Sequence, residues 1–265
     1  MAADMRLIAD THVHFYPCYD LQQALNNLRR NLSTLNRNAV CMAFLAERHD
    51  CHFFRQFGER GREMLGADIQ VQLYDNALLF SEEGYPDLYF FAGRQIITRE
   101  RIEVLALTTD MEIEDGLPVD EVVSRVTANG GIPVISWAPG KWFFQRKKVV
   151  ESLLDRYEPG TILFGDTTLR PTGWLEPDLM KKAVRQGFGL VAGSDPLPFK
   201  GEEVVMGRYA VRLEADFDAD DPVASIRSLF TRPKFTPARV GRRGRPLETL
   251  FRLFQNARSK NIRKL

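Results

Sequence analysis

Short apolar runs that are typical of buried strands alternate with amphipathic helical segments along most of this chain. Such alternation indicates βα units, and repeated βα units favour a parallel sheet. Two of the helices have clear start signals. Asp20 is a plausible N-cap for a helix over 21–35, and Pro222 follows Asp221 at the start of another over 222–230. The strand-like runs are 7–13, 39–46, 104–108, 133–137, 161–165, 189–193 and 209–213.

The number and order of these units indicate the fold class. A chain of 265 residues can hold one large domain, and barrels of alternating strands and helices commonly have this length. We therefore expect an α/β fold, a TIM-like (β/α)7 barrel, with residues 1–230 forming one domain. Counting strands does not decide whether the sheet closes or takes an eighth strand.

Residues 68–101 interrupt this alternation of strands and helices. The segment contains four short strand-like runs with turn sequences at Asp75-Asn76 and Glu83-Gly84. Strands this close together predict an antiparallel β meander inserted into the barrel. It could serve as a lid, a dimer contact or a cover for one barrel end.

Residues 231–265 form a basic C-terminal extension that we predict to be helical. They contain 11 Lys or Arg against one acid, Glu248. A basic segment can bind nucleic acid, an acidic membrane or an acidic partner. This segment has no aromatic stacking pattern and no known binding motif. That favours a solvated arm or a helix docked on the acidic remainder over a nucleic-acid-binding tail.

Composition excludes several other classes. Hydrophobic residues make up 44% of the chain and charged residues 27%, as in a globular protein with a sizeable core. No run of about 18 apolar residues predicts a membrane span. The first residues lack an apolar signal segment, and three scattered cysteines suit a reducing compartment. We therefore expect a cytoplasmic protein.

The first strand ends in Asp10-Thr11-His12-Val13-His14. Alternate residues of a strand share a face, so Asp10, His12 and His14 should point the same way. Two imidazoles at a strand end can converge on one cation. Asp10 can orient one of these ligands by a hydrogen bond without binding the metal itself. The alternative is a pair of hydrogen-bonded core histidines.

This motif resembles the opening motif of the PHP (polymerase and histidinol phosphatase) domain and of the wider amidohydrolase-type metal hydrolases. Gly193-Ser194-Asp195-Pro196, at the end of a late strand, is similar to the aspartate-bearing strand end of amidohydrolases. The resemblance implies a site at the strand ends, with one to three divalent metals and a metal-activated water. It also implies that Asp195 is a metal ligand or the base that takes the proton of that water.

The chain departs from these families in its histidines. It has four, at positions 12, 14, 49 and 52, whereas both families take further histidines from later strands. We therefore expect one divalent ion, Zn²⁺, Mn²⁺ or Fe²⁺. Its ligands would be His12, His14 and Asp195, with Glu47 or His49 from the end of the second strand. The alternative is a degenerate barrel that has lost its metal.

Later strand ends add charged candidates. In a parallel barrel the loops after the strands gather at one face, where active sites form. Asp166 and Arg170 follow one strand and Lys141 follows another. We predict that Asp195 or Asp166 accepts a proton and that Arg170 and Lys141 neutralise the developing oxyanion. Trp137 and Trp142 could wall the pocket.

These features predict a metal-dependent hydrolase that acts on a small anionic substrate, with a phosphoester preferred. The competing reading is a catalytically degenerate barrel that binds a ligand or partner through the same face. Stoichiometric metal that is lost on mutating His12 would favour the enzyme.

Overall fold

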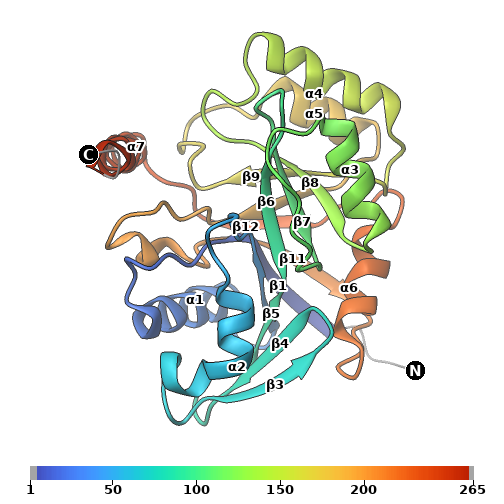
Figure 1. Ribbon diagram of the computed structural model, residues 1–265. Helices are drawn as coiled ribbons and strands as arrows, with labels where there is room; N and C mark the ends of the chain where they lie inside the picture. Colours follow the sequence, from blue (N-terminus) through green and yellow to red (C-terminus); the bar gives the residue numbers. More distant parts are fainter. Residues whose placement is uncertain (1–4, 263–265) are drawn as a thin grey trace.

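The computed structural model describes residues 5–262, with side chains through 259, and contains two mixed β-sheets (Figure 1). One sheet has the strand order β12-β11-β1-β2-β5-β4-β3, and the other β10-β9-β8-β7-β6. The α/β class predicted from the sequence is confirmed. The strands are β1 (Met5–Val13), β2 (Val40–Leu45), β3 (Gln70–Tyr74), β4 (Ala77–Ser81), β5 (Leu88–Phe91), β6 (Gly93–Ile97), β7 (Glu103–Leu107), β8 (Ile132–Ser136), β9 (Leu163–Thr167), β10 (Leu190–Gly193), β11 (Tyr209–Ala215) and β12 (Ala238–Gly241).

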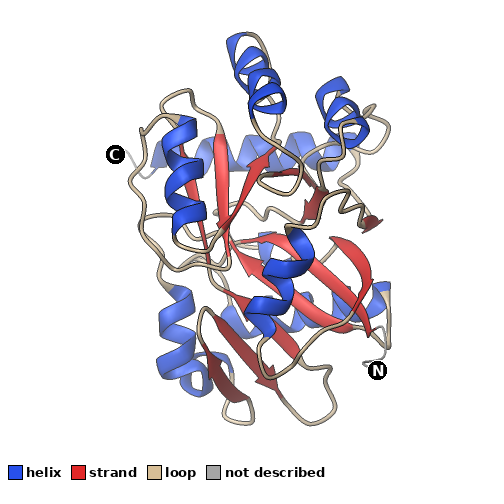
Figure 2. Cartoon of the chain, turned by 90° about the vertical axis from the view of Figure 1, so that its right-hand side faces the viewer, coloured by secondary structure: helices blue, strands red, loops and turns tan. Residues whose placement is uncertain are grey.

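Helices surround these sheets (Figure 2). The two predicted start signals are present, because Asp20 accepts a hydrogen bond from the backbone of Gln23 and Asp221 accepts one from Ala224. Within residues 5–262 no helix is long and apolar enough to cross a bilayer. The helices are α1 (Leu21–Leu35), α2 (Phe53–Leu65), α3 (Val119–Ala128), α4 (Gln145–Arg156), α5 (Asp178–Arg185), α6 (Pro222–Phe230), α7 (Pro246–Ile262) and the 3₁₀ turn η1 (Glu202–Val205).

The strand directions show that the prediction of an all-parallel barrel is wrong. β1 runs antiparallel to β11, and β7 runs antiparallel to both β6 and β8. β6 and β7 are joined by residues 98–102 only. A connection this short can only reverse the chain, since a parallel pair needs a crossover of about a dozen residues or more. The strands of residues 5–262 are assigned to two mixed sheets, so the expected all-parallel strand arrangement is wrong.

The two sheets meet at two seams. At one seam the backbone N–H of Asp195 donates to the carbonyl of His12 over 2.9 Å. At the other, Glu47 donates to the carbonyl of Gly93 (3.0 Å) and accepts from Gln95 (2.8 Å). β5 continues almost directly into β6 there, so one chain segment belongs to both sheets. The first seam brings the ends of β1 and β10 together.

Gly193 permits the close approach at the first seam. A Cβ atom at this position would lie 2.3 Å from the Cβ of His12 and 2.4 Å from its backbone nitrogen. We expect Gly193→Ala to lower the free energy of unfolding by about 1–3 kcal/mol, because the backbones must separate. Urea denaturation measures this change. Gly58→Ala is the matched control, since its Cβ would meet only the side-chain ends of Leu73 at 3.2 Å and Leu78 at 3.6 Å. Equal losses in both variants would contradict the assignment.

The inserted meander and the basic segment are both parts of this framework. β3, β4 and β5 form the predicted antiparallel meander, whereas β6 belongs to the second sheet. In the segment 231–265, β12 pairs with β11, and α7 confirms the predicted helix. Residues 263–265 lie outside the described residues. A separate domain boundary near 230 stays a prediction.

Candidate metal centre

Three predicted ligands meet at the first seam. The Nε2 atoms of His12 and His14 are 3.0 Å apart, and they lie 3.6 Å and 3.7 Å from Oδ1 of Asp195. All three side chains are buried. Zn–N bonds of about 2.0–2.1 Å in a tetrahedron separate neighbouring ligand atoms by about 3.3–3.5 Å. We call these three residues the ligand triangle, and its dimensions fit one small divalent cation.

The outer nitrogens of both imidazoles have protein partners. His12 Nδ1 lies 3.4 Å from the hydroxyl of Ser136, and the ring of His14 hydrogen-bonds the backbone of Ala46. When Nδ1 carries the proton, the Nε2 lone pair is free for a ligand bond. Partners of this kind fix the tautomer and orientation of metal-binding histidines. The surroundings therefore aim both Nε2 atoms at the same point.

Burial favours the neutral form of every member of the ligand triangle. Desolvation lowers the pKa of His12 to about 4 and holds that of His14 well below its ordinary value. Desolvation also raises the pKa of Asp195 to about 7. Neutral imidazole is the form that binds a metal, and a nearby cation would favour the Asp195 carboxylate. The donor set thus suits a cation on chemical grounds as well as in its spacing.

Asp10 supports the ligand triangle through the backbone. Its Oδ1 accepts from the N–H groups of Ser194 (2.8 Å) and His12 (3.1 Å), and its Oδ2 accepts from Gly207 (2.9 Å). Asp10 therefore holds the main chain beside Asp195. The sequence pattern instead predicts that it orients a ligand directly. Asp195 itself has a φ of 47°, which is unusual for a residue other than glycine. Strain of this kind concentrates at functional sites.

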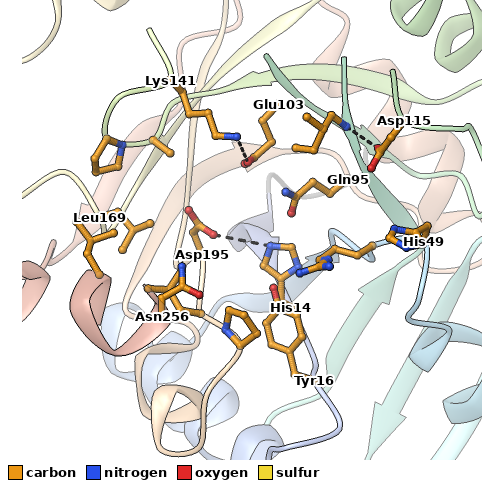
Figure 3. Close-up of a pocket in the computed structure, with 17 residues that line it drawn as sticks. His14, Tyr16, His49, Gln95, Glu103, Asp115, Lys141, Leu169, Asp195 and Asn256 are labelled. Carbon is orange, nitrogen blue, oxygen red and sulfur yellow. Dashed lines mark hydrogen bonds and ion pairs between the residues drawn. The ribbon is translucent and has the colours of Figure 1, made fainter. Parts of the chain in front are cut away.

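A cavity of about 390 Å³ opens above the ligand triangle. Figure 3 shows Lys141 and Glu103 on one wall and Asn256 on another, with His14 and Asp195 between them. Lys141 Nζ lies 3.7 Å from Glu103 Oε2, and Arg48 also lines the cavity. One wall comes from the basic C-terminal segment, because Asn256 belongs to α7. The cavity thus combines cationic donors with His14 and Asp195 of the ligand triangle.

Glu103 is a candidate site residue that the sequence patterns did not indicate. Its Oε1 lies 3.9 Å from Nε2 of His12, and burial raises the pKa of this carboxyl, with the Asp195 charge adding to the effect. Local patterns indicate candidate residues at the C-terminal ends of strands, whereas Glu103 is the first residue of β7. Because β7 is antiparallel to β8, its first residue pairs with Ser136, the last residue of β8. A strand direction deduced from the short 98–102 connection could have found it.

Glu47 and His49 are placed differently from the ligand triangle. Glu47 is buried at the second seam, where its Oε1 accepts from the N–H of Phe54 and its Oε2 lies 3.6 Å from Arg94. Burial raises its pKa to about 7. His49 is exposed at the cavity rim. The structure does not bring either residue into the group of His12, His14 and Asp195.

Asp166 and Arg170 are not brought to the cavity. Asp166 is buried and accepts from Arg170, Arg239 and the hydroxyl of Tyr209. The next residue on β9, Thr167, hydrogen-bonds Asp195. Successive side chains of a strand face opposite sides, which directs Asp166 away from the site. Asp166 thus lies outside the group of His12, His14 and Asp195, with its oxygens bound by these three donors.

The two candidate tryptophans pack within the fold instead of lining the cavity. Trp142 is buried, and its indole N–H donates to the carbonyl of Ser136 over 3.1 Å. Trp137 is also buried and contacts Trp174 edge-on. Neither tryptophan is among the described residues that line the cavity, to which Tyr16 contributes a phenol ring. The predicted tryptophan wall is therefore not formed.

No protein-family model and no curated protein matches this sequence. Two solved structures share its fold at low sequence identity. PsfC from Pseudomonas syringae PB-5123 is 12% identical, with a TM-score of 0.60, over 97% of this chain and 99% of that chain. The lesion-specific endonuclease PfuEndoQ from Pyrococcus furiosus is 14% identical, with a TM-score of 0.52. That likeness covers 86% of this chain and 56% of the endonuclease chain. Both likenesses concern the fold.

Proposed function

We propose that this protein is a metal-dependent hydrolase that acts on a small anionic substrate, with a phosphoester as the bond attacked. The observation that carries the proposal is the ligand triangle at the base of a cavity with cationic walls. The resemblance of Asp10–His14 to the PHP opening motif supports it. A protein of the same fold is a lesion-specific endonuclease, which supports phosphoester chemistry.

The ligand triangle would hold one divalent cation. Two imidazoles and one carboxylate leave a coordination position open, as in catalytic zinc sites. A bound cation would polarise the phosphoryl oxygen and lower the pKa of the attacking water. Ser136 and Ala46 keep His12 and His14 in the binding tautomer.

The cavity walls supply the remaining chemistry. Glu103, rather than Asp166, would accept the proton at Oε1, because this atom lies 3.9 Å from Nε2 of His12 and burial raises the pKa of the carboxyl, which makes it a stronger base. The Nζ group of Lys141 and the guanidinium of Arg48 can bind the phosphoryl oxygens and stabilise developing negative charge. A cavity of about 390 Å³ has the size of a small-molecule site.

Metal analysis combined with hydrolysis of p-nitrophenyl phosphate tests this proposal. We expect one equivalent of Zn, Mn or Fe in protein purified without chelator. Prolonged chelation should abolish hydrolysis and re-addition of metal should restore it. Glu103→Gln should lower kcat about 100-fold or more and change KM little. Glu114→Gln, in an exposed carboxylate that binds Arg125, is the control.

Two results would overturn the proposal. Protein that contains no stoichiometric metal, and takes none up on titration with Zn²⁺, Mn²⁺ or Fe²⁺, cannot use this chemistry. Metal bound at the ligand triangle without hydrolysis of phosphate mono- or diesters would instead favour the non-catalytic, ligand-binding barrel.

A further inference from the structure

α7 exposes an apolar face to solvent. Leu247, Leu250, Phe251 and Phe254 are 81%, 65%, 58% and 58% exposed. Their spacing of three, four and seven residues places them along one side of a helix. We call these four residues the α7 stripe. Single exposed apolar residues are ordinary, but a continuous stripe of this kind marks a contact surface.

The opposite side of α7 binds the body of the protein through polar groups. Arg252 is 3% exposed and donates to Glu202, to the hydroxyl of Thr168 and to the carbonyl of Asp195. Thr249 is also buried. This is the reverse of an ordinary surface helix, which buries its apolar face. The anchored polar side fixes the direction in which the α7 stripe points.

Cations flank the α7 stripe. Arg245 and Arg258 are exposed near its two ends, and the acid of the helix, Glu248, is paired with Arg208. From residue 258 to 265 the sequence adds Arg258, Lys260, Arg263 and Lys264 and no acid. α7 lies at one edge of the molecule (Figure 1). Among the residues with described side chains, this surface therefore combines protruding apolar side chains with Arg245 and Arg258, neither of which forms an ion pair there.

We propose that the α7 stripe docks on the surface of a bilayer that contains anionic lipid. An amphipathic helix with Leu and Phe on one face and Lys or Arg beside it lies in the headgroup region of such a membrane. Each Lys or Arg near an anionic surface strengthens binding about fivefold. Residues 1–230 carry an excess of acid, so this edge is the part of the molecule that an anionic surface attracts.

Charge and shape disfavour the other occupants. Two copies of α7 packed antiparallel through their stripes would bring the Arg258 end of one helix beside the Arg245 end of the other. Juxtaposed like charges oppose such an interface. A nucleic-acid strand would match the cations and could stack bases on Phe251 and Phe254, but it would leave Leu247 and Leu250, the two most exposed members of the stripe, in water.

Flotation with vesicles tests the proposal on the full chain. We expect the protein to bind vesicles of phosphatidylcholine mixed with phosphatidylglycerol about tenfold or more tightly than vesicles of phosphatidylcholine alone. High salt should weaken this binding. Leu250→Ser combined with Phe251→Ser should reduce it about tenfold or more. Both positions are exposed, so the variant should melt at the same temperature as the wild type.

Leu73→Ser is the matched control. Leu73 is 64% exposed on β3, and its replacement should leave vesicle binding unchanged. Binding that is equal for the two lipid compositions, absent for both, or unaffected by the Leu250/Phe251 change would overturn the proposal. A dimer in light scattering that the same double variant converts to monomer would overturn it too, because a second copy would then cover the stripe.

Discussion

His12→Ala is expected to lower the affinity for the divalent ion by more than about 100-fold. Loss of an outer hydrogen-bond partner of a metal ligand typically costs about 10–100-fold, and removal of one of three ligands costs more. His12 Nε2 is 3.0 Å from its counterpart on His14 and 3.6 Å from Asp195, so its removal leaves two of the three ligand atoms. Competition against a chromophoric chelator measures the affinity, and hydrolysis of p-nitrophenyl phosphate should fall with it.

His49→Ala is the matched control for this experiment. His49 lines the same cavity but is exposed and stands outside the ligand triangle, so the variant should keep its metal. Ser136→Ala should give an intermediate loss of about 10–100-fold, because it removes the partner of His12 Nδ1. Equal metal content in the His12 and His49 variants would show that the ion binds elsewhere or not at all.

Arg252→Met is expected to lower the free energy of unfolding by about 3–5 kcal/mol. Its guanidinium is buried against Glu202 at 2.9 Å, and removing one partner of a buried ion pair leaves an uncompensated charge. Arg252 also donates to the carbonyl of Asp195, so metal affinity should fall as well. Urea denaturation gives the stability change.

Two further variants make this prediction specific. Arg252→Met combined with Glu202→Met should be more stable than the single variant, since no buried charge is left alone. Arg125→Met removes solvent-exposed ion pairs with Glu121 and Glu114, and should cost much less than the Arg252 change. A loss below about 1 kcal/mol for Arg252→Met would mean that α7 does not depend on this anchor.

Several parts of the fold could be predicted from local sequence patterns. The strand ending in His12 and His14, the N-caps Asp20 and Asp221, and the meander over β3–β5 each depend on residues close together in the chain. α2 was missed, although Phe53 and Phe57 are buried along it. Gly58 and Gly61 lower the helix propensity of this segment. Packing of Phe53 and Phe57 against the core compensates for that loss of propensity.

The direction of most strands depends on pairing with segments distant in the sequence, which local patterns do not contain. Local patterns place candidate residues at the ends of strands, and these candidates include Asp195 and Lys141 but not Glu103, which begins an antiparallel strand. They also include Asp166, whose side chain faces away from the cavity toward Tyr209.

The amino-acid sequence alone determined that this chain is α/β and that two histidines at one strand end could share a cation with Asp195. Alternation along a strand is a local property, so His12 and His14 had to face the same way. Only the tertiary structure decided which residues complete the site. The seam at Gly193 brings β10 to β1, and the antiparallel β7 delivers Glu103. Arg252 anchors α7 beside Asp195 and leaves its apolar stripe facing outward. These contacts join segments far apart in sequence, and packing rather than local propensity selects them.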